Sequence, residues 1–162
     1  MKNLFTKIVS ATESLKQKII KLNDYWSTQY DMRVSYSAVS GYTVNTANSW
    51  CHIIGNILRI QYNHRLSTAI SNSTSSKKQI GTMTIYDDDH ILDWSTTPTN
   101  SSSVLGATGP LATYICYDWT NDGAGTYTCK IQLCGNVGGQ MASNTTSDAY
   151  QASFNCLVAR NL

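Results

Sequence analysis

The chain has 162 residues, a formal net charge of +2 and only 14% charged residues. Its basic residues lie mostly in the first half, and only Lys130 and Arg160 follow residue 100. The body of the chain therefore lacks the basic stripe of a nucleic-acid-binding domain. Two prolines and 41% apolar residues exclude a disordered protein and suit one folded domain with a short appended segment.

Residues 1–26 carry apolar side chains at the spacing of a coiled coil. Two seams run along the segment, formed by Ile8, Leu15 and Leu22 and by Phe5, Thr12, Ile19 and Trp26. Their period of ~3.5 residues predicts a helix that joins copies of itself, in three strands at least as readily as in two. The alternative is a single amphipathic helix packed on its own β domain. The helix needs one partner or the other, because isolated helices of this length are marginally stable in water.

The same segment lacks the features of a targeting or membrane segment. Its apolar residues are spread around a polar face, without the continuous apolar core and cleavage site of a signal peptide. Nothing later in the sequence approaches the ~18 apolar residues that a membrane span needs. We therefore expect no export signal and no membrane insertion, and a helical stem at residues 1–28 followed by a head domain at residues 29–162.

From Val34 onward, apolar residues alternate with Ser, Thr, Asn and Gly, which is typical of half-buried strands. We expect short strands within 27–47 and further strands at 50–54, 57–62, 66–70, 80–86, 111–119, 127–133 and 150–158. Gly55-Asn56 and Asp122-Gly123 have the composition of hairpin turns. The polar segments expected to be loops are 71–79, 95–103 and 135–149. Strands at this spacing, without helices between them, predict a mainly β fold, an antiparallel β-sandwich or jelly roll.

The five cysteines are Cys51, Cys116, Cys129, Cys134 and Cys156. Their number is odd, no CxxC pair occurs, and four of them lie within apolar or alternating runs, where cysteine acts as a small core residue. We expect reduced thiols in a protein assembled in a cytosol. A disulfide between neighbouring strands is the alternative.

No motif indicates catalysis, a metal or a cofactor. The head contains no glutamate, no GxSxG motif and no Ser-His-Asp signature, so we expect a protein that is not an enzyme. The run Asp87-Asp88-Asp89-His90 offers oxygen ligands to a hard cation but does not match an EF-hand loop, and a solvated turn is the simpler interpretation. His52 lies in an apolar run and is expected to be a core or interface residue.

Aromatic side chains beside aspartates are the best candidates for a binding site. A flat apolar ring next to polar acceptors suits a sugar. The candidate ligand-binding residues are Asp93, Trp94, Tyr117, Asp118 and Trp119. The alternative for each ring is a place in the core or in a subunit interface.

Three segments of the head carry motifs in a recognisable order. Residues 48–60 (NSWCHIIGNILRI) place an aromatic strand before Ile-Gly-Asn and a long apolar strand, residues 80–83 (IGTM) follow, and residues 152–160 (ASFNCLVAR) close the chain. After an N-terminal coil, this order resembles the tail and baseplate proteins of tailed bacteriophages. Residues 84–87 (TIYD) depart from that family, which often has prolines there. The resemblance implies a trimeric receptor-binding or fibre-head domain, a β-sandwich on a helical stem, and it assigns no binding residue.

We therefore expect a non-enzymatic tail-tip or fibre-head domain of a phage or prophage, in a virion assembled in the host bacterial cytoplasm. It would form a homotrimer, contact other virion proteins and bind a host-surface receptor, for which a glycan is the favoured class. The loops expected to be available, at the end of the head away from the stem or in clefts between subunits, are 71–79, 87–103, 119–126 and 135–149. The rival interpretations are a purely structural virion subunit (head fibre, baseplate or tail scaffold), a depolymerase fragment and a cellular carbohydrate-binding module.

Overall fold

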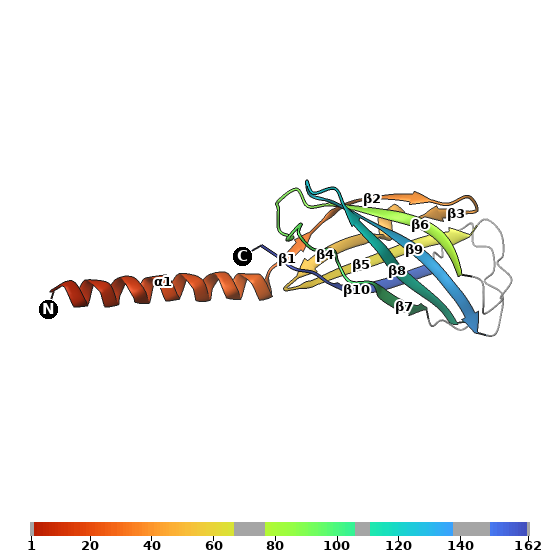
Figure 1. The fold of residues 1–162 in the computed structure, drawn as a ribbon. Coiled ribbons are helices and arrows are strands. Elements are labelled where there is room, and N and C mark those ends of the chain that lie inside the picture. Colours follow the sequence, from red (N-terminus) through yellow and green to blue (C-terminus); the bar gives the residue numbers. More distant parts are fainter. Residues whose placement is uncertain (1, 67–76, 106–110, 138–149, 162) are drawn as a thin grey trace.

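The computed structural model describes residues 2–66, 77–105, 111–137 and 150–161 (Figure 1). A long helix, α1 (Lys2–Ser27), is followed by strands and by one short 3-10 helix, η1 (Thr46–Asn48). The strands are β1 (Gln29–Asp31), β2 (Arg33–Ala38), β3 (Tyr42–Val44), β4 (Trp50–Ile54), β5 (Ile57–Leu66), β6 (Lys77–Tyr86), β7 (Ser101–Leu105), β8 (Leu111–Asn121), β9 (Thr126–Val137) and β10 (Tyr150–Leu157). The prediction of a mainly β chain with an N-terminal helix is confirmed.

The strands form two antiparallel sheets. The first sheet has the order β1-β4-β5-β10, with β3 also paired to β5, and the second has the order β2-β6-β9-β8-β7. Buried side chains from both sheets belong to one hydrophobic core. Figure 1 shows the strands running roughly along the line of the helix, which leaves the head at one end.

The two sheets are joined at both sides of the head. On one side the chain passes directly from β1 in the first sheet to β2 in the second through Met32, whose N–H donates to the carbonyl of Cys51 (2.9 Å). On the other side, hydroxyl groups from residues 99–103 accept backbone N–H groups of β10. The pairs are Ser103 with Ser153 (3.0 Å), Ser101 with Asn155 (3.2 Å) and Thr99 with Leu157 (2.8 Å). These bonds satisfy donors on the edge of β10 that would otherwise be open to pairing with another chain.

The alternation of the sequence determines which side chains enter the core. On β5 the buried apolar residues are Leu58, Ile60 and Tyr62, each at most 1% exposed, and the residues between them face outward. On β10 the buried residues are Ala152, Phe154 and Cys156, and Val158, directly after the strand, continues the pattern. Because successive side chains of a strand point to opposite faces, the inward set could be read from the sequence.

β5 extends further than the sequence indicates. The expected separate strand at 66–70 is wrong at its first residue, since Leu66 ends β5, and residues 67–70 lie outside the described residues. The polar residues Asn63, His64 and Arg65 break the apolar alternation. They remain in the strand because backbone pairing with β10 and β3 continues through them.

Strands also occupy parts of the expected loops. Residues 77–79 belong to β6, residues 101–103 belong to β7 and residues 135–137 belong to β9. The serines of β7 gave no sign of a strand, but they pair with β8 and their hydroxyls bond β10. The remaining expected loop residues at 71–76 and 138–149 lie outside the described residues.

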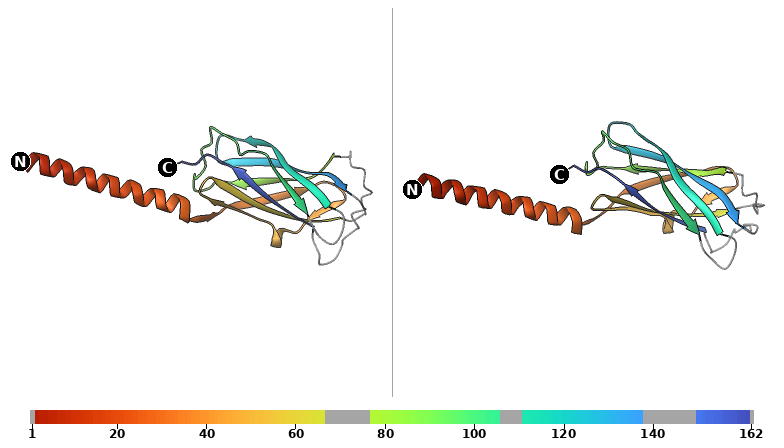
Figure 2. Two further views of the ribbon diagram at one scale, coloured as in Figure 1. Left: turned by 90° about the horizontal axis from the view of Figure 1, so that it is seen from below. Right: turned by 60° about the horizontal axis from the view of Figure 1, so that its bottom comes forward.

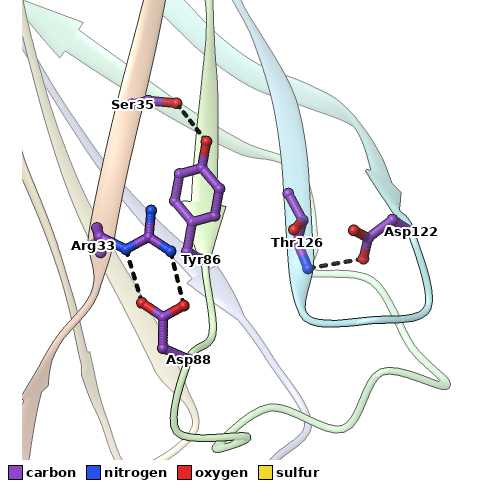
Figure 3. A network of polar contacts seen from close by, with 6 residues as sticks. All are labelled: Arg33, Ser35, Tyr86, Asp88, Asp122 and Thr126. Carbon is purple, nitrogen blue, oxygen red and sulfur yellow. Dashed lines mark hydrogen bonds and ion pairs between the residues drawn. The ribbon is translucent and has the colours of Figure 1, made fainter.

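Both predicted hairpin turns are present. Gly55 joins β4 to β5 with φ +56°, and the β8–β9 turn contains Gly123 with φ +71° and Gly125 with φ +104°, values that glycine adopts without steric cost. In the second turn the carboxylate of Asp122 accepts the N–H of Ala124 (2.9 Å) and the N–H of Thr126 (2.9 Å), the second of which is drawn in Figure 3. These bonds hold the pKa of Asp122 below its ordinary value.

The helix does not pack along the head. In the views of Figures 1 and 2, α1 projects away from the strands and meets them only at its C-terminal end. The alternative of an amphipathic helix packed on its own β domain is therefore wrong. The helix ends at Ser27 and β1 begins at Gln29, while the division into a stem (1–28) and a head (29–162) as independent units stays a prediction.

Candidate functional site

The helix presents its apolar seams to solvent. The exposed fractions are 55% for Ile8, 60% for Leu15, 60% for Ile19, 53% for Leu22 and 55% for Trp26. Phe5 lies in the helix, but its side chain is outside the described part of the chain. The polar seam residue Thr12 donates its hydroxyl to the carbonyl of Ile8 (2.9 Å), which satisfies it within the helix. From Ile8 to Leu22 the seam is thus an apolar stripe with no partner among the described residues.

Apolar side chains also flank the seams. Leu4 is 65% exposed, Val9 46% and Ile20 44%. Leu4 and Val9 occupy the positions on either side of the two seams, where charged residues usually stand in a two-stranded coiled coil. The apolar face is therefore broader near the N-terminus than the two seams alone.

Arg160 fastens the stem to the head. Its Nη1 donates to the carbonyl of Tyr25 (3.0 Å), in the last turn of α1, and to the carbonyl of Gly55 (2.9 Å) in the β4–β5 turn. Its guanidinium carbon lies 4.3 Å from the ring centroid of Tyr25 and 5.1 Å from that of Tyr30. The last carbonyls of a helix lack intrahelical partners and carry partial negative charge, so a cation stabilises this end.

The indole of Trp26 lies against Gly55. A Cβ built on Gly55 would stand 2.6 Å from Cε3 of Trp26, a distance at which atoms overlap. The last seam residue therefore packs on the head through a position that only glycine can occupy without a shift. We call this end of the head, where α1 meets the β4–β5 turn, the stem end.

Trp94 is held in place by a buried carboxylate. Asp87 is 1% exposed, and its carboxylate accepts the N–H groups of Ile91 (2.8 Å) and Leu92 (2.8 Å) and the indole N–H of Trp94 (2.9 Å). A Cβ on Gly125 would lie 2.8 Å from Cζ2 of the same indole. The N–H and one edge of this candidate ring are thus engaged within the chain, and the ring packs against the core.

Asp93, the predicted partner of Trp94, bonds its own turn. Its Oδ1 accepts the hydroxyl of Ser95 (2.7 Å) and the backbone N–H of Ser95 (2.9 Å). The two bonds hold the pKa of Asp93 below its ordinary value. Asp93 and Trp94 are adjacent in sequence but have different partners.

The second candidate group lies on a β-bulge. The pairing of β8 with β9 shifts between Tyr117 and Thr120, and Asp118 within the bulge has φ +54°. Asp118 forms an ion pair with Lys130 on β9, which raises the pKa of the lysine. The indole of Trp119 packs against the core, and its N–H is buried without a hydrogen-bond partner among the described residues. The indole of Trp119 thus has a buried donor without a partner, while Asp118, next to it in sequence, forms an exposed ion pair.

Both candidate groups lie at the stem end, so the first of the two positions expected for their loops, the end of the head away from the stem, is wrong for 87–94 and 119–126. The bridge between Leu92 and Arg160, and the bond from the N–H of Asp93 to the carbonyl of Ala159 (3.0 Å), place the segment after β6 beside the stem. The N–H of Asp87 bonds the carbonyl of Gly125 (2.8 Å), so the β8–β9 turn is at the same end (Figure 1). The antiparallel connections determine this placement, and periodicity along the chain does not report it.

The acidic run at residues 87–90 is only in part a solvated turn. Asp88 forms a bidentate ion pair with Arg33 (2.8 Å for each bond), whose guanidinium lies 3.8 Å from the ring centroid of Tyr86 (Figure 3). The hydrogen bonds from Arg33 hold the pKa of Asp88 below its ordinary value. The last three residues of the run are exposed, as expected, but Asp87 is buried and structural.

A row of outward side chains on the first sheet was missed as a candidate surface. Trp50 and His52 stack with ring centroids 4.1 Å apart, and Nδ1 of His52 lies 2.8 Å from Oδ1 of Asp31. Arg59 stands opposite His52 in the strand register. Residues 50, 52 and 54 occupy alternate positions of a strand whose other positions are buried, and this alternation was the available signal.

His64 is the core histidine of the head. It is fully buried, and its Nε2 lies 3.0 Å from the hydroxyl of Tyr114. The rings of Tyr42, Tyr62 and Tyr150 stand about it. Burial lowers the pKa of His64 to about 4, so the ring is neutral near pH 7.

All five cysteines are free, as predicted. Cys116 and Cys129 lie on the paired strands β8 and β9 with their Sγ atoms 3.3 Å apart, in the buried core. Burial raises the pKa of the Cys51 thiol well above its ordinary value, so it behaves as an apolar residue. The cytosolic assembly inferred from reduced thiols stays a prediction.

Within the described ranges, no three or more His, Cys, Asp or Glu side chains are grouped so that they could hold a metal ion. No helix in the described part of the chain is long and apolar enough to cross a membrane. The chain matches no protein-family model, no curated protein and no solved structure.

Proposed function

We propose that the protein is a trimeric attachment protein of a phage or prophage virion, with a coiled-coil stem and a β-sandwich or jelly-roll head. The observation that carries the proposal is the stem, because α1 projects from the head with both seams exposed. A solitary helix with such a stripe is marginal in water. Three copies that pack their seams together remove the stripe from water and hold three heads at one end.

The side chains beside the seams support three strands over two. Leu4 and Val9 extend the apolar face to both sides of the seams near the N-terminus. Two helices cover a narrow face, whereas each helix of a three-stranded coil contacts two neighbours and buries a broader one. The phage assignment itself rests on the resemblance of residues 48–60, 80–83 and 152–160.

Attachment to a neutral, hydroxyl-rich receptor is the second part of the proposal. The outer face of the second sheet carries Ser35, Thr84 and Thr128 side by side. Two cations of this sheet, on β2 and β9, are each paired with an aspartate, which suits neutral ligands better than anions. A shallow polar site buries little area, so each head binds a sugar weakly, and three linked heads supply avidity. Because Trp94 and Trp119 lie at the stem end, we place any sugar platform they form in the clefts between neighbouring heads.

The platform is tested by binding of the full-length protein to cell walls of candidate hosts. Trp119→Ala removes the ring, while Trp119→Phe keeps an aromatic face and serves as the matched control. We expect the alanine variant to lose at least about tenfold in affinity and the phenylalanine variant to stay close to wild type. Equal binding by wild type and a folded Trp119→Ala variant would remove Trp119 from the site.

The second candidate function is a structural subunit that binds only other virion proteins. The position of the candidate rings at the stem end favours it, because that end faces the particle when the stem is the attachment point. Failure of the wild-type trimer to bind any host surface, together with binding to a tail or baseplate component, would decide for this function. No catalytic step belongs to either proposal.

A further inference from the structure

The outer face of the first sheet carries an apolar row at the stem end. Ile54 on β4 and Leu157 on β10 are both direct register partners of Ile57 on β5. The three side chains alternate with buried neighbours and so point to the same outer face. Leu157 is 55% exposed, the largest value for a large apolar side chain in the described part of the head.

The second sheet shows a different outer face. Its register aligns Ser35 with Thr84 and Thr128, and Ser37 with Thr82. The hydroxyls of Thr84 and Thr128 lie 3.3 Å apart. One face of the head is therefore apolar near the stem, whereas the other presents hydroxyl groups beside the ion pairs of Arg33 with Asp88 and of Lys130 with Asp118.

The apolar row continues the seam of the stem. Ile54 and Ile57 flank the turn that contains Gly55, and Gly55 touches the indole of Trp26. Trp26 is the last residue of the helical seam. The exposed apolar side chains of α1 are thus followed, across the turn, by the partly buried Ile54 and Ile57 and the exposed Leu157 on the first sheet, so the apolar surface of the stem extends onto the head.

The next row on this face is polar and contains one acidic residue, Asp31, and one basic residue, Arg59. Asp31 has a side chain that is 79% exposed, and His52 separates it from Arg59. Arg59 is exposed and forms no ion pair within the described part of the chain. In a cyclic oligomer one part of a face contacts a different part of the same face on the neighbouring copy. The acidic edge of one copy, on β1, can therefore meet the basic centre of the next copy, on β5, and their charges are complementary.

We propose that the outer face of the first sheet, from Ile54, Ile57 and Leu157 to Asp31 and Arg59, contacts a second copy of this chain. The first sheets then lie toward the axis of the oligomer, and the hydroxyl-rich second sheets face outward. This inference rests on the proposed oligomer and adds which face of the head is buried in it. It also leaves the second sheet as the broad surface that a host can reach.

The test uses full-length protein with one added cysteine and a short bismaleimide cross-linker. Leu157→Cys places a thiol on the proposed contact face, and Ser37→Cys places a matched thiol on the exposed outer face of the second sheet. Wild type measures the background from Cys134, since the other four native cysteines are buried. We expect covalently linked chains from Leu157→Cys and only the background from Ser37→Cys.

A second measurement follows the strength of the assembly. Leu157→Glu should raise the dissociation constant of the oligomer by about tenfold or more, because it moves a charge into the contact, whereas Ser37→Glu should leave it unchanged. A trimer that shows no linkage at Leu157→Cys and no weakening by Leu157→Glu would overturn this inference and leave the proposed stem intact. A monomeric wild type by light scattering would overturn both.

Discussion

The stem and the head use apolar residues in opposite ways. On β5 the inward residues Leu58, Ile60 and Tyr62 are at most 1% exposed, whereas Leu15 and Ile19 on α1 are each 60% exposed. Both segments are amphipathic in sequence, one with the period of a strand and the other with the period of a coiled coil. The head completes its core within one chain, whereas in our proposal the stem buries its apolar seam only by packing against other copies.

A charge in the stem seam tests this difference most severely. Leu15→Asp places a carboxylate in the seam of every copy, and burying it without a partner costs roughly 3 kcal/mol or more. We expect the dissociation constant of the oligomer to rise by a factor of about 100 or more, while the melting temperature of the head stays unchanged. Sedimentation velocity and thermal melting measure the two quantities.

Ser14→Asp, one position outside the seams, is the matched control and should keep the oligomer. If Leu15→Asp instead lowered the melting temperature of the head and left the mass unchanged, the helix would be part of the core of the head.

The largest effect expected within the head comes from Asp87. Asp87→Ala leaves the N–H groups of Ile91, Leu92 and Trp94 without their acceptor. Loss of a buried, multiply bonded carboxylate should lower the free energy of unfolding by roughly 4 kcal/mol. Urea denaturation measures it, and Asp89→Ala on the exposed part of the same run should change it little. Equal stability of the two variants would contradict the structural role of Asp87.

Acid should weaken the head through His64. Its pKa of about 4 in the folded state lies below the ordinary 6.5, so the unfolded chain takes up the proton first. Stability is therefore full above pH 6.5 and falls as the pH drops toward about 4, by about 3 kcal/mol in all. Denaturation at a series of pH values measures the slope, and the exposed His90→Asn variant should keep it. Constant stability between pH 6.5 and 5 would show that His64 is not buried in the folded protein.

The smallest loss of stability is expected from Arg160, which joins the stem to the head. Arg160→Ala removes the bonds to the carbonyls of Tyr25 and Gly55 and should cost about 1–2 kcal/mol. The expected result is faster amide hydrogen exchange in the β4–β5 turn, with the far strands unchanged. Arg33→Ala, which breaks an exposed ion pair, is the control. Unchanged exchange around Gly55 in Arg160→Ala would mean that Trp26 alone holds the joint.

The sequence predicted what depends on local periodicity. The inward residues of β5 and β10 and the turns at Gly55 and Gly123 follow from alternation and from glycine conformations. Strand ends were less predictable, because Asn63, His64 and Arg65 stay in β5 through backbone pairing rather than through side-chain pattern.

The candidate site was harder to predict than the fold. Asp87 reads as part of a charged turn, and only the three-dimensional structure shows it buried against Trp94. The bulge that turns Trp119 toward the core depends on the register between β8 and β9. Neither effect has a signature within the few residues on each side, since both depend on contacts distant in sequence.

The mass of the wild-type protein in solution tests the central claim most directly. Light scattering at micromolar concentration should give three times the 17.9 kDa mass of the chain. A mass of one chain under the same conditions would show that the exposed seam of α1 does not assemble the protein, and the account of a trimeric stem would be wrong.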